Sequence, residues 1–135
     1  EDVFKILSDD KSTLPVSILS CDVDNLKNIN DEFGHAIGDE ALISISKIIV
    51  DNCRPDDIVV RYGGDEFMIV LKNTSHEDAL QIGERIHEAK AHYLNNKQVH
   101  VSMGCATKES IDQNFDEVIR LADAKMYQHK RSKRK

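Results

Sequence analysis

Blocks of apolar and polar residues alternate along the chain, and their periods predict a sheet covered by helices. Continuous apolar runs that end at acidic or turn residues are typical of buried strands. One such run occupies residues 16–24, and the β-rich runs at 57–62 and 67–71 together with residues 99–106 also predict strands. Apolar residues recur at helical spacing in residues 25–33, 37–52, 77–94 and 115–129. Strands mixed with helices in this way indicate an α/β or α+β fold.

Two of the strand-like runs flank a short turn, Gly63-Gly64-Asp65-Glu66. Adjacent glycines can take the positive φ angles that tight hairpin turns favour. The pattern therefore predicts a β-hairpin with two acidic side chains at its turn. Gly104, inside the last strand-like run, predicts close packing of the backbone at that point.

The composition is that of an ordinary globular protein. The chain has 135 residues, 40% of them hydrophobic and 31% charged, which we interpret as one domain over residues 1–135. No apolar run reaches the roughly 20 residues of a membrane-spanning helix, so we expect a cytoplasmic segment without membrane contact. Because the chain begins with Glu1 rather than Met, we expect it to belong to a longer multidomain protein. Three widely spaced cysteines, Cys21, Cys53 and Cys105, predict reduced core thiols.

The charge of the chain is unevenly distributed. The net charge is −6, yet the last seven residues carry five of the 18 Lys and Arg, so the rest is strongly acidic. An acidic body without an aromatic stacking platform argues against nucleic-acid binding. The basic end is compatible with contact to phosphate groups or with a solvated helix end.

Two acidic clusters occur where strands end or turn. Asp22 and Asp24 close the first strand-like run, and Asp65 and Glu66 lie in the predicted hairpin turn. If these strands are neighbours, the carboxylates meet at one edge of the sheet and offer the hard oxygen ligands that Mg²⁺ prefers. Acidic turns are also common as solvated loops, and residue types alone leave both interpretations open.

Three segments resemble the motifs of one protein family, in the family's order. They are DVDNLKNINDEFGHAIGDEAL at residues 22–42, RYGGDEF at 61–67 and LADAKMYQHKRSKR at 121–134. These segments are similar to the motifs of GGDEF domains, the catalytic domains of diguanylate cyclases. The resemblance implies a palm-like fold with a mostly antiparallel sheet, as in class III nucleotide cyclases. It also implies that a homodimer joins two GTP molecules into cyclic di-GMP and releases pyrophosphate.

The resemblance further implies a metal centre. Asp22, Asp65 and Glu66 would hold Mg²⁺ or Mn²⁺ through their carboxylates, and Val23 would do so through its carbonyl oxygen. Asp65 and Glu66 would be the catalytic residues. Asp65 is the favoured base, although activation by the metal alone would make a dedicated base unnecessary.

Other matched positions would bind GTP. Asn30 and Asp39 match the family's guanine-recognition positions, and a carboxylate can accept from guanine N1–H and N2, donors that adenine lacks. The substrate's phosphates would lie against Lys27, Gly63, Gly64, Lys130 and Arg134. The alternatives are an Asn on a helix surface, an Asp that caps a helix after Gly38, and solvated basic side chains.

An R-x-x-D string, formed by Arg54 and Asp57, matches the family's inhibitory product site, and Arg85 matches a secondary contact of that site. An Arg can pair with guanine O6 and N7, and a carboxylate can accept from the opposite edge. The alternative is a charged turn in which Pro55 ends the preceding helix.

The chain departs from the family pattern at two places. Leu26 replaces the Phe that is common in the family, and the opening motif of typical members is absent. A competing function is a non-catalytic GGDEF module that binds GTP or cyclic di-GMP as a regulatory receptor. The intact string from Gly63 to Glu66 favours the enzyme.

Overall fold

The computed structural model describes residues 11–24, 26–61, 63–88, 91–92, 98–99 and 101–132. The helices are η1 (Lys11–Thr13), α2 (Leu26–Phe33), α3 (His35–Asp51), α4 (His76–Glu88) and α5 (Phe115–Ser132). The strands are β1 (Val16–Val23), β2 (Ile58–Arg61), β3 (Glu66–Leu71), β4 (Ala91–His92), β5 (Gln98–Val99) and β6 (Val101–Lys108). Arg134, which the sequence predicts to contact phosphate, lies outside the described residues.

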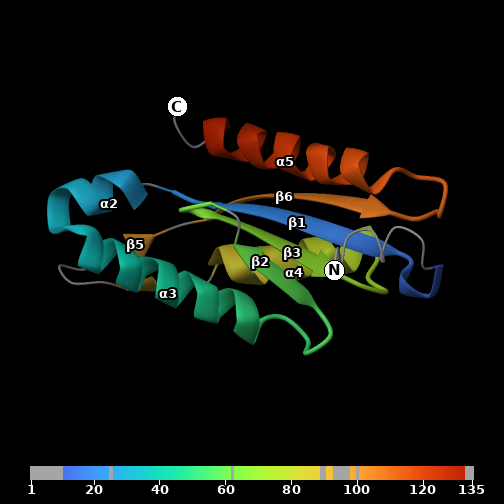
Figure 1. Cartoon of the computed structure of the whole chain (residues 1–135), viewed down its shortest axis with the longest axis horizontal. Helices are drawn as coiled ribbons and strands as arrows, with labels where there is room; N and C mark the ends of the chain where they lie inside the picture. Colours follow the sequence, from blue (N-terminus) through green and yellow to red (C-terminus); the bar gives the residue numbers. More distant parts are fainter. Residues whose placement is uncertain are drawn as a thin grey trace.

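Four antiparallel strands form the main sheet in the order β2-β3-β1-β6 (Figure 1). The central strand β1 pairs along its length with β3 on one side and with β6 on the other. Every residue of β1 is buried, because the strand has neighbours on both sides and helices over both faces. The predicted α+β fold with a mostly antiparallel sheet is confirmed.

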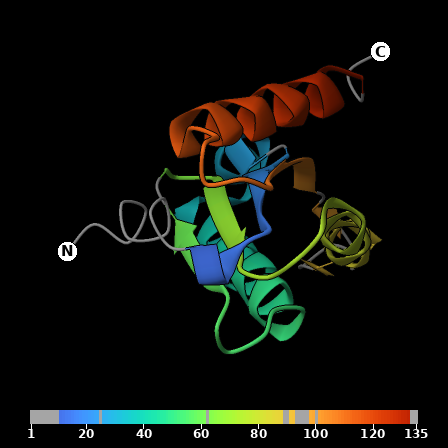
Figure 2. The ribbon, with the colours of Figure 1, turned by 90° about the vertical axis from the view of Figure 1, so that its right-hand side faces the viewer.

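Helices cover both faces of this sheet. α5 lies along one face, over β1 and β6, whereas α3 and α4 lie on the other side (Figure 2). Alternate residues of β1 enter two separate cores: Leu19 and Cys21 pack in the cluster that includes α3 and α4, and Ile18 packs in the cluster that includes α5. Since side chains alternate along a strand, Asp22 shares the face of Ile18 and points toward α5.

The structure corrects the predicted bounds of two helices. α4 ends at Glu88 instead of residue 94, and beyond it β4 pairs with β5. A helical period cannot report this pairing, because two strands of two residues each are too short to show a period of their own. α3 begins at His35 instead of Ile37, directly after Gly34, whose φ of 91° glycine adopts without strain.

The three cysteines are free thiols, as predicted. Cys21 and Cys105 are buried, and Cys53 is half-buried beside the core. Burial raises the pKa of Cys53 and of Cys105 to about 11, and it also raises the pKa of Cys21. All three thiols therefore stay protonated and unreactive near neutral pH.

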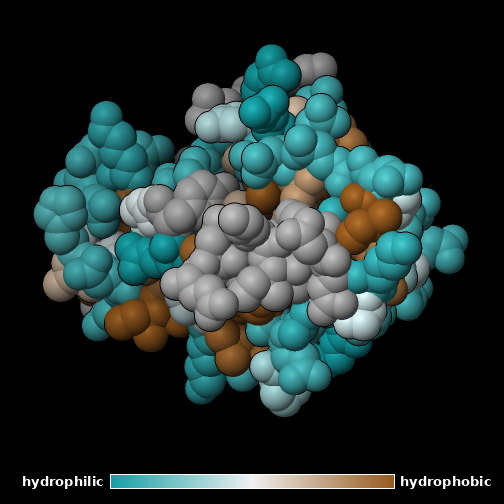
Figure 3. All heavy atoms as spheres, turned by 45° about the vertical axis from the view of Figure 1, so that its right-hand side comes forward, coloured by the Kyte–Doolittle hydropathy of each residue, from teal (hydrophilic) through white to brown (hydrophobic). Residues whose placement is uncertain are grey.

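Exposed large hydrophobic side chains are spread over three helices. They are Ile43 and Val50 on α3, Leu80 on α4, and Leu121 and Tyr127 on α5. Among the coloured residues of the face drawn in Figure 3, hydrophilic residues predominate and the hydrophobic areas are small, which is typical of surface exposed to water. None of the described helices has the length and apolarity of a membrane span.

Gly104 lies where α5 crosses β6. A Cβ atom on Gly104 would overlap the carbonyl oxygen of Ala122 and the backbone nitrogen of Met126. The close backbone packing predicted from the sequence is therefore confirmed. The missing side chain lets the helix lie directly on the strand.

Gly104→Ala is expected to lower the free energy of unfolding by about 2–3 kcal/mol, because the added methyl group meets helix backbone that cannot rotate away. Urea unfolding followed by circular dichroism measures this loss. Gly64→Ala is the matched control, since a Cβ atom there meets nothing within 4 Å. An equal loss in both variants would contradict the packing argument.

Candidate metal and nucleotide site

Three carboxylates meet at the end of β1. Asp22 and Glu66 are partners across the β1–β3 ladder, and the Val23 N–H donates to the Asp65 carbonyl oxygen at 2.8 Å. These contacts fix the hairpin turn against the end of β1. Side-chain oxygens of Asp22, Asp65 and Glu66 lie within 4.8 Å of one another. The sequence prediction that acidic residues from both clusters meet is confirmed for these three.

Asp22 is the buried member of this acidic cluster, with 4% of its surface exposed. Its Oδ2 accepts a hydrogen bond of 2.9 Å from Lys130 Nζ. Its Oδ1 is buried and has no partner among the described residues. Burial raises the pKa of Asp22 and the charge of Asp65 adds to this, although Lys130 opposes both. The ionised carboxylate is therefore costly to keep here even with Lys130 beside it, and a further cation would lower that cost.

Lys130 reaches the acidic cluster from the last turns of α5. Burial acts to lower the pKa of Lys130, but its hydrogen bond to Asp22 and the charges of Asp22, Asp24 and Asp65 raise it. The ammonium group therefore remains protonated and supplies a permanent positive charge. Lys27, the other described lysine predicted to contact phosphate, is exposed in the first turn of α2.

The acidic cluster fits a divalent metal ion. Mg²⁺ takes oxygen ligands at about 2.1 Å and usually binds through one or two carboxylates together with phosphate and water. The cluster provides three carboxylates, and one of their oxygens is buried and unpartnered among the described residues. Such hard oxygen donors suit Mg²⁺ and Mn²⁺ alike. The ligand roles, including that of the Val23 carbonyl oxygen, stay predictions.

The turn before β3 leaves space beside the acidic cluster. A Cβ atom on Gly63 would press against Glu66 Oε2 at 3.1 Å, whereas Gly64 has nothing within 4 Å. Arg61 donates to the Gly64 carbonyl oxygen at 2.9 Å and so ties the turn to β2. No role for Arg61 follows from the sequence, because this contact depends on the path of the turn.

Buried serines connect the strands to acidic side chains near the cluster. Ser102 on β6 donates to the two carboxylate oxygens of Asp24 at 2.8 Å and 3.1 Å. Ser20 on β1 donates to Asp123 on α5. These contacts join residues 78 and 103 positions apart, and a serine within an apolar strand gives no local signal of them.

The two residues predicted to recognise guanine lie on α2 and α3. Asn30 is half-buried, and a Cβ atom on Gly38 would collide with its Oδ1. Asp39 follows Gly38 and is exposed in the second turn of α3. Because α3 begins at His35 with Gly34 as its N-cap, Asp39 does not cap the helix, and that alternative is wrong. The guanine role stays a prediction.

Arg54 and Asp57 form an ion pair in the loop before β2. The Arg54 guanidinium contacts the carboxylate at 3.1 Å and 3.4 Å, and the Arg54 backbone N–H donates to it at 2.8 Å. Arg54 also donates to the carbonyl oxygen of Lys72 at 2.8 Å. The Asp57 side chain is 1% exposed and that of Arg54 is 54% exposed, so the loop presents the Arg and buries the Asp.

A pocket of about 280 Å³ lies beside this ion pair, and Arg54 and Arg85 both line it. The two arginines that the resemblance assigns to an inhibitory site therefore share one pocket. Asp57 does not line it, because its carboxylate is turned onto Arg54. In this structure Asp57 positions the guanidinium instead of offering an acceptor to a ligand.

Nearly the whole chain, residues 4–135, matches the family model described as diguanylate cyclase, GGDEF domain. The chain belongs to the GGDEF family. The motifs that resemble this family include the three residues of the acidic cluster, so the family assignment and the site geometry concern the same residues.

Curated relatives of this GGDEF domain come from several bacteria. Diguanylate cyclase DosC of Escherichia coli is 38% identical over 122 residues, which cover 87% of this chain and 26% of DosC. Response regulator PleD of Caulobacter vibrioides is 37% identical over 127 residues, 89% of this chain and 28% of PleD. Diguanylate cyclase A of Treponema denticola is 35% identical over 142 residues, 99% of this chain and 38% of the relative. The chain spans less than half the length of these relatives.

Solved GGDEF structures share the fold. The active GGEEF domain of a diguanylate cyclase from Vibrio cholerae has a TM-score of 0.82 at 34% identity, covering 87% of this chain and 78% of that one. The GGDEF domain of YfiN from Pseudomonas aeruginosa has a TM-score of 0.80 at 30% identity, covering 96% and 83%. A microbial GGDEF domain that interacts with cyclic di-GMP has a TM-score of 0.76 at 31% identity, covering 95% and 78%.

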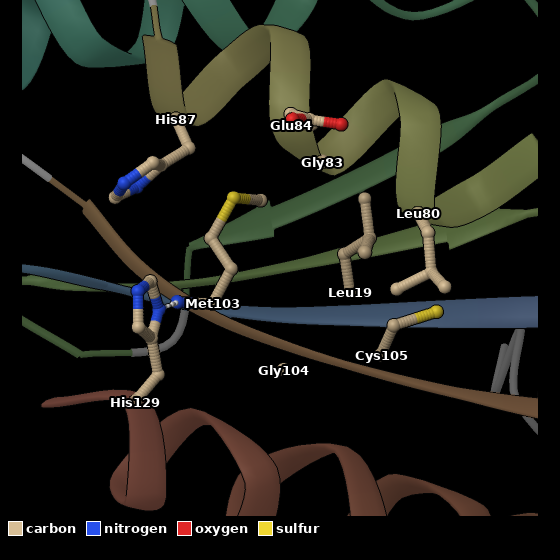
Figure 4. A pocket seen from close by; sticks show the side chains of 9 residues that line it. All are labelled: Leu19, Leu80, Gly83, Glu84, His87, Met103, Gly104, Cys105 and His129. Atoms are coloured by element: carbon tan, nitrogen blue, oxygen red, sulfur yellow. Dashed lines mark hydrogen bonds between the residues drawn. The ribbon is translucent and has the colours of Figure 1, made fainter. Parts of the chain in front are cut away.

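A second pocket of the GGDEF domain, of about 300 Å³, lies between α4 and α5 at the free edge of β6 (Figure 4). At one end His129 Nδ1 accepts a hydrogen bond of 3.0 Å from the Met103 N–H. His87 Nδ1 donates to the Val101 carbonyl oxygen at 2.8 Å. The two histidines therefore satisfy backbone groups at the strand edge, and this pocket contains no residue predicted for the nucleotide site.

Proposed function

We propose that this GGDEF domain is a diguanylate cyclase, which condenses two GTP molecules into cyclic di-GMP and releases two pyrophosphates. The observation that carries the proposal is the cluster of Asp22, Asp65 and Glu66 with Lys130 beside it. Relatives named diguanylate cyclases, at 35–38% identity, support the activity. The domain would be cytoplasmic.

The reaction joins each GTP to the other. The 3′-hydroxyl oxygen of one nucleotide bonds to the α-phosphorus of the second, the bond from that phosphorus to pyrophosphate breaks, and the hydroxyl proton is lost. A divalent ion held by Asp22, Asp65 and Glu66 would stabilise the developing phosphate charge and acidify the hydroxyl. Asp65 is less buried than Asp22, so its carboxylate is accessible to receive the proton.

The remaining residues would bind and orient GTP. Lys130 and Lys27 would neutralise triphosphate charge, and the open turn at Gly63 and Gly64 would let phosphate approach the backbone. Asn30 and Asp39 would pair with the guanine edge. These residues hold the nucleotide and do not react.

Two copies of the domain are required in this proposal, because one chain offers one set of these residues and the ring closes between two nucleotides. The initial rate of cyclic di-GMP formation, followed by chromatography, should rise with the square of protein concentration for the isolated chain. It should rise linearly for a chain fused to a dimerising coiled coil. A linear rise for an isolated chain that size-exclusion chromatography shows to be monomeric at these concentrations would contradict the homodimer.

Asp39→Ala is expected to weaken GTP binding roughly tenfold to a hundredfold, because buried guanine donors without an acceptor cost about 1–3 kcal/mol. ATP binding should change much less, since adenine lacks these donors. Calorimetry with non-hydrolysable analogues of both nucleotides measures the difference. Glu40→Ala, at the next exposed position of α3, is the control and should leave both affinities unchanged. Equal losses for GTP and ATP in Asp39→Ala would contradict guanine recognition.

We further propose that cyclic di-GMP binds in the pocket of Arg54 and Arg85 and inhibits the enzyme. The shared pocket, the exposed Arg54 guanidinium and the cyclic di-GMP interaction of a GGDEF neighbour at 31% identity support this site. If the domain bound cyclic di-GMP there and made none from GTP, it would be a regulatory receptor instead.

Arg54→Ala is expected to weaken cyclic di-GMP binding at least tenfold, since a charged hydrogen-bond partner contributes about 1.5–3 kcal/mol. Product should then accumulate to a higher plateau while the initial rate changes little. Calorimetry and a progress curve measure the two effects. Arg120→Ala, an exposed position on α5, should behave like the parent. Unchanged affinity in Arg54→Ala would reduce this ion pair to a structural loop contact.

A further inference from the structure

Lys130 lies beside Asp22, the buried carboxylate of the acidic cluster. Its Nζ lies 2.9 Å from Asp22 Oδ2, and the two side chains are 20% and 6% exposed. The other oxygen of Asp22 is buried and unpartnered among the described residues. The lysine therefore supplies to this carboxylate a compensating charge that a metal ion would also supply.

We propose that Lys130 exchanges partners during binding: it competes with the divalent ion for Asp22 in the nucleotide-free domain and moves onto the triphosphate when nucleotide enters with the ion. This inference rests on the proposed function only in naming the nucleotide. The ion pair from which we infer the competition joins Lys130 and Asp22, both described residues of this chain.

Electrostatics favours the exchange. A divalent ion at a carboxylate oxygen and an ammonium group hydrogen-bonded to the same carboxylate repel each other at short distance, and burial weakens the screening by water. Asp22 is buried, so little solvent separates the two cations. The negative triphosphate removes this conflict, because it offers Lys130 a new partner.

The side chains around Lys130 suit such a movement. Lysine has a compact charge on a flexible four-carbon stem, unlike the rigid fork of arginine. The charges of Asp24 and Asp65 also act on Lys130, and Ser102 fixes Asp24 with two hydrogen bonds. Asp24 therefore keeps the ammonium group near the site when the ion takes Asp22.

The exchange couples two ligands. While Lys130 sits on Asp22, the ion binds weakly, and nucleotide that attracts Lys130 strengthens binding of the ion. Coupling is reciprocal, so the ion must strengthen nucleotide binding by the same factor. The domain would then bind free divalent ion poorly and would bind ion and nucleotide together.

The test measures Mn²⁺ binding by electron paramagnetic resonance, without nucleotide and with a non-hydrolysable GTP analogue. In the parent, the analogue should tighten Mn²⁺ binding about tenfold or more, within the usual range of coupling. Lys130→Met, which keeps the length of the side chain without its charge, should bind Mn²⁺ about tenfold more tightly than the parent without nucleotide. The analogue should then tighten Mn²⁺ binding by a smaller factor than in the parent, because only the phosphate ligands still contribute.

Two further variants isolate the cause. Lys130→Arg keeps a positive charge beside Asp22 and should keep Mn²⁺ binding as weak as in the parent. It therefore still tests the effect of this charge if the Met variant does not fold. Lys125→Met removes one charge elsewhere on α5 and should not change Mn²⁺ binding. Equal Mn²⁺ affinity in the parent and Lys130→Met, or equal tightening in Lys125→Met, would overturn the inference. Because no turnover is measured, a failure of cyclase activity would not mimic either result.

Discussion

Asp65→Asn is expected to lower turnover at least a thousandfold while the fold stays intact. The substitution removes one charge directed at the metal at nearly constant side-chain volume. A bound ion stabilises the phosphoryl charge of the transition state by several kcal/mol. Each 1.36 kcal/mol of this stabilisation corresponds to a factor of ten in rate. The fold survives because the backbone carbonyl of Asp65, not its carboxylate, accepts the hydrogen bond from Val23.

Circular dichroism and the initial rate of cyclic di-GMP formation test this expectation together. Asp51→Asn is the matched control, because Asp51 is exposed at the end of α3 and lies outside the acidic cluster. Parent-like turnover in Asp65→Asn would show that the carboxylate has no part in catalysis. A collapsed spectrum would instead mean that its role is structural.

Asp22→Asn is expected to abolish turnover to a similar extent and, unlike most substitutions of buried residues, to stabilise the metal-free fold. The amide carries no charge to bury, and it relieves repulsion from Asp65, which raises the pKa of Asp22 together with burial. Thermal unfolding without metal should show a midpoint higher by roughly 3 °C, the effect of about 1 kcal/mol in a domain of this size.

The stabilisation should depend on pH. Because the folded-state pKa of Asp22 is raised, the parent is relatively most stable at low pH and loses stability as pH rises through that pKa. The two proteins should therefore unfold alike in acid, and the variant should gain its advantage toward neutral pH. Mg²⁺ added together with a non-hydrolysable GTP analogue should raise the midpoint of the parent more than that of the variant. A variant less stable than the parent at neutral pH would contradict the inference that the ionised Asp22 carboxylate destabilises the metal-free fold.

Much of the fold was predictable because its signals are local. The apolar run of β1 and the paired glycines before Asp65 each report their own element, and they predict the strand and the hairpin. The meeting of Asp22 with Asp65 and Glu66 followed from the single assumption that these strands are neighbours, which the β1–β3 ladder confirms.

The unpredicted features depend on pairing and packing that a hydrophobic period does not report. The pairing of β4 with β5, and the hydrogen bond from Ser102 to Asp24, leave no trace in a local period. Arg54 and Asp57 are only three positions apart, but the sequence does not tell which of the two side chains the loop buries. Burial of this kind is set by packing and not by residue type.

The identity of the product tests the proposed activity most directly. The domain, dimerised by fusion to a coiled coil, would be incubated with Mg²⁺ and an equal mixture of unlabelled and ¹⁵N-labelled GTP, and the products identified by mass spectrometry. The account predicts cyclic di-GMP in light, mixed and heavy forms, with the mixed form most abundant. It also predicts two pyrophosphates for each cyclic di-GMP. GTP recovered unchanged, or a product containing one guanine only, would contradict it.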